Sequence, residues 1–408
     1  MASSESVDTT DLFEKDQTEG YRIPALLHIP NANILLAFAE KRSGLRDEDA
    51  TKLYMREGTY DNPSNKFQWK EVKAIQSATK EGYRSMNPCP VYEKKTNTIF
   101  LFFIAVENHK SEQDQIDQNK NAARLYYVTS ADHGQNWSEP SKDLTDDFEC
   151  DWATFALGPG HGIQLSNGCL IIPANAHVKE SDKQVRVHAF TFFSEDRGKT
   201  WQLGSFVSGE ECGECQVAMV HEYKVSSSKC CKVSNCRRPL IYCNARSNKN
   251  GEKQYRVETF SQDGGKTFTE GKLMKRLVEP PKGCHGSVIS FPSSVVLRVK
   301  NYSEVEKYHD GQGNNSQEFD IILFSHTTDT KSRNDLGIYL ATYSGNSPIW
   351  TNPWVISAGK CGYSDLAFIQ LPKKNPVVAC LFEQGSTNEK ISFCLLQIDD
   401  IIVNTIKR

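Results

Sequence analysis

The sequence lacks the features that would place it in several common classes of protein. No apolar run approaches the length of a membrane-spanning helix, and residues 1–11 have neither the basic nor the apolar segment of a secretory signal. Neither a G-x-S-x-G motif nor a glycine-rich phosphate loop is present, which argues against a serine hydrolase of that kind and against a nucleotide site. The formal net charge is only −3, so no overall basic surface favours nucleic acid. We therefore expect a protein that meets the cytosol, with no signal peptide, no transmembrane helix and no nucleic-acid partner.

The 13 cysteines are spread along the chain in an odd number, which favours reduced thiols over a disulfide framework. Cys212 and Cys215 have the C-x-x-C spacing found in zinc ribbons, and Cys230, Cys231 and Cys236 follow nearby. No second C-x-x-C pair accompanies them, so we favour free thiols and expect no metal and no cofactor. Acylation of Cys230 or Cys231 at a membrane surface is an alternative that the sequence leaves open.

One short motif, Ser-x-Asp-x-Gly-x-(Thr/Asn)-aromatic, is present in three copies. The copies lie at residues 130–137, 194–201 and 261–268. Ser and Asp side chains accept hydrogen bonds from nearby backbone N–H groups, and Gly adopts a positive φ, so the motif predicts a tight turn anchored by its aromatic residue. Each copy follows a strand-like run, which favours a β-hairpin repeated once per sheet. This pattern is typical of propeller blades.

Weaker copies of the turn keep only the aromatic residue, at Trp69 and Trp350. The five marked positions leave room for a sixth blade, which strands near residues 377–382 and 391–398 would close against the N-terminal one. The spacing of these aromatic residues along the chain therefore predicts an all-β fold, a six-bladed β-propeller.

A repeated blade argues for a single domain in spite of the chain length. We expect residues 1–18 to form a polar N-terminal extension, with ordered structure beginning at Tyr21, and residues 19–408 to form one catalytic propeller. Two polar stretches look like insertions into this repeat, one near residues 222–239 and one near residues 300–318.

Several motifs outside the repeat are similar to those of one enzyme family. They are Y-R-I-P (21–24), F-A-E-x-R (38–42), D-E-D-A (47–50), R-S-M-N-P-C-P (84–90), E-C-Q-V (214–217), N-A-R-S (244–247), P-P-K-G-C-H-G-S-V (280–288), R-N-D-L-G (333–337) and C-G-Y-S-D-L (361–366). With the Asp-box turns, they make the chain resemble the animal exo-α-sialidases, which are six-bladed propellers that remove terminal sialic acid. The resemblance is strongest to the plasma-membrane-associated, ganglioside-preferring vertebrate members, and the cytosolic members come next.

This resemblance implies substrates, location and mechanism. The expected substrates are terminal α-linked sialic acids on gangliosides, oligosaccharides and glycoproteins. The expected location is peripheral, at the plasma membrane or other intracellular membranes, or cytoplasmic. The expected reaction is hydrolysis with retention of configuration.

The family's arginine triad matches Arg22, Arg246 and Arg333. Sialic acid carries a carboxylate on its anomeric carbon, and arginine binds carboxylates through two parallel hydrogen bonds better than lysine does. The three arginines lie far apart in the sequence, so they meet only if the chain closes into a ring.

The family's catalytic residues match Tyr363 as nucleophile, Glu214 as its base and Asp47 as acid and base. Sialidases use tyrosine where most retaining glycosidases use a carboxylate, because a second anion would be repelled by the substrate's own carboxylate. A phenol with a pKa near 10 needs a neighbouring base to take its proton.

Further residues match the family's substrate pocket. Glu383 corresponds to the residue that orients the first arginine, and Glu40, Arg42, Asn87 and Glu112 correspond to pocket positions. The chain departs from the family at three further positions assigned to substrate binding, Asn175, His177 and His285. The first two stand where relatives carry paired tyrosines, and the third replaces a common glutamine. These departures predict altered preference among gangliosides and glycoproteins rather than loss of activity.

A different class of function is also open at this stage. Propellers often serve as binding scaffolds, so the fold alone predicts only a non-catalytic sialoglycan-binding or interaction module. A lectin needs the arginines but has no need of Asp47, Glu214 and Tyr363. Their joint presence favours the enzyme.

Overall fold

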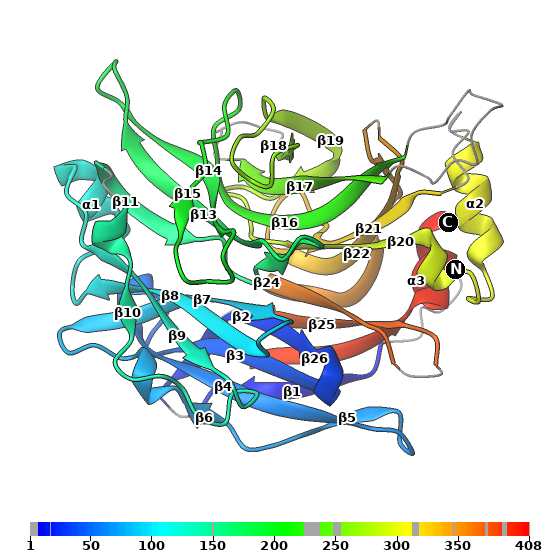
Figure 1. Cartoon of the computed structure of the whole chain (residues 1–408), viewed down its shortest axis with the longest axis horizontal. Coiled ribbons are helices and arrows are strands. Elements are labelled where there is room, and N and C mark those ends of the chain that lie inside the picture. The colour runs from blue at the N-terminus through cyan, green and yellow to red at the C-terminus, as the bar shows by residue number, and fades with distance from the viewer. Residues whose placement is uncertain are drawn as a thin grey trace.

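The computed structural model describes residues 7–407 apart from residues 17, 149–150, 224–236, 248–253, 312–317, 346, 372–373 and 386–389. Strands dominate this part of the chain and surround a central axis (Figure 1). The predicted insertion near residues 222–239, with Cys230, Cys231 and Cys236, falls largely outside the described residues. Within the described residues, no helix is both long and apolar enough to cross a membrane.

Hydrogen bonding joins consecutive strands into two smaller sheets in the first part of the chain. The first sheet contains β2 (Gly20–Ile29), β3 (Ile34–Arg42), β4 (Ala50–Asp61), β5 (Lys66–Trp69) and β6 (Lys73–Ala74). The second sheet contains β7 (Tyr83–Glu93), β8 (Thr98–Glu107), β9 (Ala123–Ser130) and β10 (Lys142–Asp143).

Two larger sheets complete the structure. The third contains β11 (Trp152–Leu157), β12 (Ile163–Gln164), β13 (Leu170–Lys179), β14 (Val185–Ser194), β15 (Gln202–Leu203), β16 (Cys212–Tyr223), β17 (Arg237–Ser247), β18 (Gln254–Ser261) and β19 (Lys272–Glu279). The fourth contains β1 (Thr9–Glu14), β20 (Ser287–Pro292), β21 (Asp320–Thr327), β22 (Asn334–Tyr343), β23 (Ile349–Trp350), β24 (Trp354–Ile369), β25 (Val377–Gln384) and β26 (Lys390–Gln397). Each larger sheet joins two successive meanders by hydrogen bonds, so the count of six blades stays a prediction.

The strands nearest the axis follow one another around a closed ring. Strand β2 contacts β7, β7 contacts β12, β12 contacts β16, β16 contacts β20, β20 contacts β24, and β24 contacts β2. The all-β propeller predicted from the sequence is therefore confirmed. Because each of these strands has one end at the same mouth of the ring, residues from distant parts of the chain meet there.

The repeated motif forms the predicted turns. In the central copy, the Ser194 hydroxyl accepts a hydrogen bond from the Gly198 amide at 2.7 Å, and Asp196 accepts one from the Thr200 amide at 2.9 Å. Gly198 has a φ of 83°, as the turn requires. Trp201 is buried, and its ring lies 4.7 Å from that of Phe102. The other two copies have the same hydrogen bonds, with Asp132 and Asp263 as acceptors.

The N-terminal segment differs from the sequence-based expectation that order begins at Tyr21. Residues 9–14 form β1, which pairs antiparallel with β26. Leu12 and Phe13 are buried in the core, so this segment contributes apolar surface that its polar neighbours obscure in the sequence. The N-terminal strand thus completes the sheet that the C-terminal strands begin.

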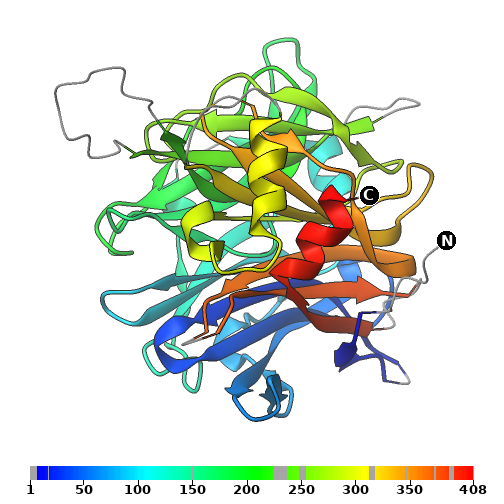
Figure 2. The ribbon, with the colours of Figure 1, turned by 90° about the vertical axis from the view of Figure 1, so that its right-hand side faces the viewer.

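Among the residues that the structure describes, three short α-helices lie outside the strands, namely α1 (Glu112–Gln118), α2 (Tyr302–Asp310) and α3 (Ile398–Ile406). The polar stretch near residues 300–318 contains α2, where the sequence suggested a loop. Val305 of α2 is buried in one apolar cluster with Ile401 and Ile402 of α3, which explains why a helix forms there. The two helices lie side by side against the outside of the fourth sheet (Figure 2).

Candidate active site

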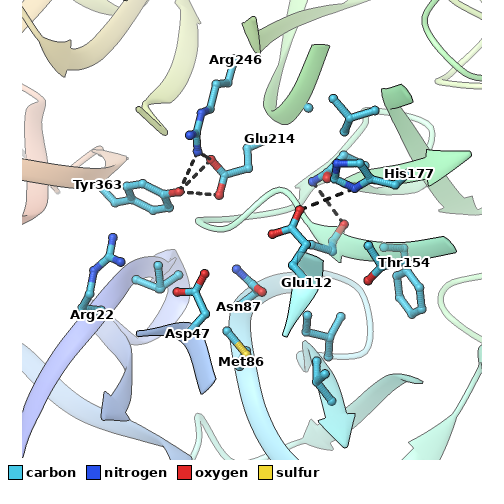
Figure 3. Close-up of a pocket in the computed structure, with 18 of the residues that line it drawn as sticks. Arg22, Asp47, Met86, Asn87, Glu112, Thr154, His177, Glu214, Arg246 and Tyr363 are labelled. Atoms are coloured by element: carbon cyan, nitrogen blue, oxygen red, sulfur yellow. Dashed lines mark hydrogen bonds and ion pairs between the residues drawn. The ribbon is translucent and has the colours of Figure 1, made fainter. Parts of the chain in front are cut away.

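A cavity of about 300 Å³ opens at one mouth of the ring and is lined by many charged side chains (Figure 3). Arg22 reaches it from β2, Asn87 from β7, Glu214 from β16 and Tyr363 from β24. Arg246 comes from β17, next to the inner strand β16. The ring therefore brings together the residues that the sequence placed in one site.

Tyr363 and Glu214 are in direct contact at the floor of the cavity. The Tyr363 hydroxyl oxygen lies 2.6 and 2.8 Å from the two carboxylate oxygens of Glu214, to which it donates. Arg246 Nη1 donates to Glu214 at 2.6 Å and to the Tyr363 hydroxyl at 3.1 Å. This triangle is the phenol, base and cation that the sequence predicted from three separate motifs.

Burial and the neighbouring charges together shift the pKa values of Glu214 and Tyr363. Burial alone would raise the pKa of the Glu214 carboxyl group, but the adjacent Arg246 guanidinium outweighs it and lowers that pKa to about 2. Burial and the Glu214 carboxylate raise the pKa of the Tyr363 hydroxyl, against the influence of the surrounding arginines. In the absence of substrate, Glu214 is therefore ionised and Tyr363 keeps its proton.

Arg22 is held by Glu383, as the family resemblance implied. Its Nε and Nη2 donate to the two Glu383 oxygens at 3.0 and 3.2 Å. Glu383 also accepts from the backbone amides of Ile23 at 2.9 Å and Tyr363 at 3.0 Å. Ile23 has a φ of 58°, which is strained for a β-branched residue, so the carboxylate holds backbone that would otherwise relax.

Arg333 is bound differently from the other two arginines. Its Nε and Nη2 donate to the Gly283 carbonyl at 3.1 and 2.9 Å, and among the described residues no carboxylate pairs with it. Its guanidinium lies 5.4 Å from the centre of the Tyr363 ring, and that of Arg22 lies 5.1 Å away. Arg333 is thus a cation that is free to take an anionic ligand.

Asp47 reaches the cavity from a short 3-10 helix, Asp47–Asp49, on the rim. Its carboxylate lies 2.7 Å from Arg42 Nη1, and its side chain is 54% exposed. Arg42 also donates its Nε to Glu40 at 2.5 Å, and Glu40 accepts from the Asn87 amide at 3.1 Å. The buried Arg42–Glu40 ion pair therefore holds the exposed Asp47 carboxyl group in place.

The opposite wall carries Asn175, His177 and Glu112. The Glu112 carboxylate lies 3.6 Å from His177 Nδ1. Partial desolvation in the cavity and the nearby Glu214 raise the pKa of the Glu112 carboxyl group, whose side chain is still 59% exposed, and burial lowers the pKa of His177 to about 4. This wall is polar and lacks aromatic hydroxyl groups at positions 175 and 177.

Three residues predicted for the substrate pocket do not themselves line the cavity. Glu40 is buried and Glu383 is partly buried, and they contact the cavity residues Arg42 and Arg22. His285 is wholly buried, and its ring lies 5.3 Å from that of Tyr363. His285 is not among the residues that line the cavity, and its part in substrate binding stays a prediction.

The cavity also includes residues that the sequence reasoning did not single out, among them Arg84, Met86, Thr154, Phe155 and Val187. The register of β7 shifts between Met86 and Cys89, so alternation along the strand does not predict which residues face inward. The presence of Arg84 in a quoted family motif was the available signal. In the part of the chain that the structure describes, no group of three or more His, Cys, Asp and Glu side chains is placed to hold a metal ion.

Comparison with known proteins agrees with this geometry. Residues 33–371 match the family model described as a BNR repeat-like domain. Sialidase-3 of Mus musculus is 38% identical, over 97% of this chain and 95% of its own length. Sialidase-2 of Rattus norvegicus is 40% identical, over 94% of this chain and 96% of its own length.

A solved structure has the same fold at lower sequence identity. The intramolecular trans-sialidase of Ruminococcus gnavus superposes with a TM-score of 0.67 at 14% identity, over 97% of this chain and 98% of that chain. The structural likeness supports the fold, and the relatives of similar length supply the family. The chain therefore belongs to the sialidase family of glycoside hydrolases.

Proposed function

We propose that this protein is a retaining exo-α-sialidase in which Tyr363 is the nucleophile, Glu214 its base and Asp47 the general acid and base. The observation that carries the proposal is the Tyr363–Glu214 contact of 2.6 Å in a cavity that also contains Arg22, Arg246 and Arg333. A binding protein would need the arginines but would gain nothing from this contact.

The substrate carboxylate binds to the arginines, and Arg333 is the one best able to receive it. Arg22 and Arg246 already have carboxylate partners, whereas Arg333 donates only to a backbone carbonyl among the described residues. A planar guanidinium offers the carboxylate two parallel hydrogen bonds. Bound in this way, the sugar presents its anomeric carbon to the Tyr363 hydroxyl.

Substrate binding also prepares the base. Arg246 is the main reason that the pKa of Glu214 is low in spite of burial. An incoming carboxylate that shares Arg246 adds negative charge and draws hydrogen bonding away from Glu214, so the pKa of Glu214 rises. Proton transfer from Tyr363 to Glu214 therefore becomes favourable only when substrate is present.

The first chemical step forms a bond between Tyr363 Oη and the anomeric carbon. The Tyr363 proton moves to Glu214, the glycosidic bond breaks, and Asp47 gives its proton to the leaving oxygen. In the second step Asp47 takes a proton from water, the hydroxyl attacks the anomeric carbon, and the tyrosine oxygen leaves and recovers its proton from Glu214. Two inversions give retention.

Gangliosides are proposed as substrates beside oligosaccharides and glycoproteins. The motifs shared with the ganglioside-preferring sialidases support this, and so does Leu45, which is 58% exposed in the segment before Asp47. An exposed apolar residue beside the catalytic rim suits a substrate whose lipid part lies in a membrane. On this proposal the protein acts as a peripheral protein at the plasma membrane or other intracellular membranes, or in the cytoplasm.

The deciding experiment measures release of sialic acid from a fluorogenic sialoside by purified protein between pH 4 and 7. Tyr363→Phe should lower kcat by ~10²-fold or more, since it removes only the attacking oxygen. Proton NMR of the first product should show the α-anomer. No turnover by the wild type, with retained binding of sialic acid, would leave the sialoglycan-binding alternative.

A further inference from the structure

Two arginines of the cavity are aimed by one short turn. The Lys282 carbonyl accepts from Arg246 Nη2, and the Gly283 carbonyl accepts from Arg333 Nε and Nη2. Gly283 has a φ of 64°, and a Cβ there would lie 2.7 Å from Arg246 Nε, so the turn fits closely under the guanidinium. The position of residues 280–286 therefore determines where both guanidiniums point.

A buried ion pair holds this turn from behind. Arg256 Nη1 donates to the Cys284 carbonyl at 2.8 Å and to Glu279 Oε1 at 2.8 Å. Glu279 Oε2 accepts from the Cys284 amide at 2.9 Å. Both side chains have 0% exposure, and neither lines the cavity. The pair thus binds both backbone polar groups of Cys284, next to the carbonyl that holds Arg333.

The same guanidinium also reaches the strand that carries Arg246. Arg256 Nε donates to Asn244 Oδ1 at 2.7 Å and Nη2 donates to the Asn244 carbonyl at 3.3 Å, two residues before Arg246. Phe324 lies 5.3 Å from the guanidinium carbon. Arg256 therefore connects β17, which supplies Arg246, to the turn that accepts from it.

The pair is charged in spite of its burial. Burial would raise the pKa of Glu279, but Arg256 and then His326 outweigh it and lower that pKa to about 2. Apolar residues of similar volume often stabilise a core as well as a buried ion pair does. Directional hydrogen bonding to Cys284 and Asn244, rather than stability, is what this pair supplies here.

We infer that Arg256 and Glu279 are positioning residues for the arginines that receive the substrate carboxylate, acting through the turn 280–286 and through Asn244. This inference rests on the proposed function. Arg256 and Glu279 touch neither substrate nor reacting atoms. Their loss should weaken carboxylate binding and leave the Tyr363–Glu214 contact in place.

The test is the double variant Arg256→Met/Glu279→Leu, which removes both charges together. Arg256→Met alone leaves Glu279 buried without its partner and is expected to unfold at lower temperature, whereas the double variant should regain much of that loss. We expect the double variant to raise KM for the fluorogenic sialoside by ~10-fold or more and to change kcat by less than ~3-fold. The Kd of free sialic acid, measured by calorimetry, should weaken by the same factor.

A matched control separates positioning from stability. Ile402→Ala removes buried side-chain volume in α3, far from the cavity, and should lower Tm while KM and Kd keep their wild-type values. Glu279→Gln keeps oxygen acceptors for the Cys284 amide and for Arg256 but removes the negative charge that faces Arg256, so it should lower Tm as well as raise KM in the same direction.

The outcomes are distinct. An active wild type with wild-type KM and Kd in both the double variant and Glu279→Gln overturns the inference and leaves the proposed function standing. A wild type that binds sialic acid without hydrolysing it overturns the proposed function, and the Kd comparison still decides the inference. A wild type that neither hydrolyses nor binds overturns both.

Discussion

At the scale of single residues, the three arginines of the cavity differ in what else they hold. Arg22 pairs with Glu383, and Arg246 pairs with Glu214, but Arg333 donates only to the Gly283 carbonyl among the described residues. If the arginines bind substrate as proposed, Arg333 does so without also holding a carboxylate of the fold. Arg333 and Arg22 are a matched pair for testing this difference.

Replacing Arg333 by Gln should raise KM for a sialoside by ~10-fold or more with little change in Tm, because no carboxylate loses its partner. Replacing Arg22 by Gln leaves the partly buried Glu383 unpaired, so unfolding should become easier by about 3 kcal/mol in addition to the loss of activity. Thermal unfolding and kinetics on both variants check this prediction. Equal losses of Tm would contradict it.

The wall formed by Asn175 and His177 allows a second test at the residue scale. His177 lies 3.6 Å from Glu112 and stands where the family resemblance implies a tyrosine, so His177→Tyr should change the ratio of kcat/KM for a ganglioside to that for a sialoglycoprotein by several-fold. The activity itself should remain. An unchanged ratio would show that this wall does not read the part of the substrate beyond the sialic acid.

At the scale of elements, the three repeated Ser-x-Asp-x-Gly turns stabilise the fold and do not line the cavity. Asp196 accepts hydrogen bonds from the Thr200 amide and hydroxyl and from the Ser194 hydroxyl. Against the opposing effect of burial, these bonds lower the pKa of Asp196 to about 2. The carboxylate lies at a turn of the scaffold and not in the cavity.

Asp196→Ala should therefore lower the free energy of unfolding by about 1–2 kcal/mol and leave KM unchanged. Because the pKa is lowered on folding, the Asp196 contribution is fully present above about pH 4 and declines as the pH falls toward 2. Urea unfolding of both proteins at neutral and acidic pH should show the difference shrinking. A difference that grows with acidity would contradict the assignment.

Local features of this chain could be predicted from the sequence, and non-local ones could not. The turn at Ser194 is specified by residues within a few positions of one another, so its pattern is visible in one segment. Strand β1 depends on pairing with β26 at the other end of the chain, and its two buried residues stand among polar ones. The bulge in β7 similarly hides that the adjacent residues Met86 and Asn87 both line the cavity.

The candidate site shows the same division. Tyr363, Glu214 and the three arginines were found by motif, and the structure brings them together in one cavity. His285 was found by the same means, but it is buried against the Tyr363 ring and does not line the cavity, which a motif alone does not tell. Arg256 carries no motif, and only the fold reveals that it joins Asn244 to Cys284.

At the scale of the whole molecule, strands from the N-terminal and C-terminal parts of the chain pair with each other and so close the ring. Strand β1 pairs with β26, and the two helices α2 and α3 pack on the outside of the same sheet. The inner strands then supply the cavity from every part of the sequence. Closing the ring of strands therefore also brings the residues of the cavity together.

The Arg22–Glu383 ion pair has a consequence for the protein while the ribosome is still synthesising it. These residues are separated by 361 positions, so Arg22 has no Glu383 carboxylate to pair with until the chain as far as residue 383 has left the ribosome. Contacts of such high sequence separation form slowly, after shorter-range pairings. Chains that have grown past residue 363 but not to residue 383 therefore contain Asp47, Glu214, Tyr363 and all three arginines without the Glu383 carboxylate that holds Arg22.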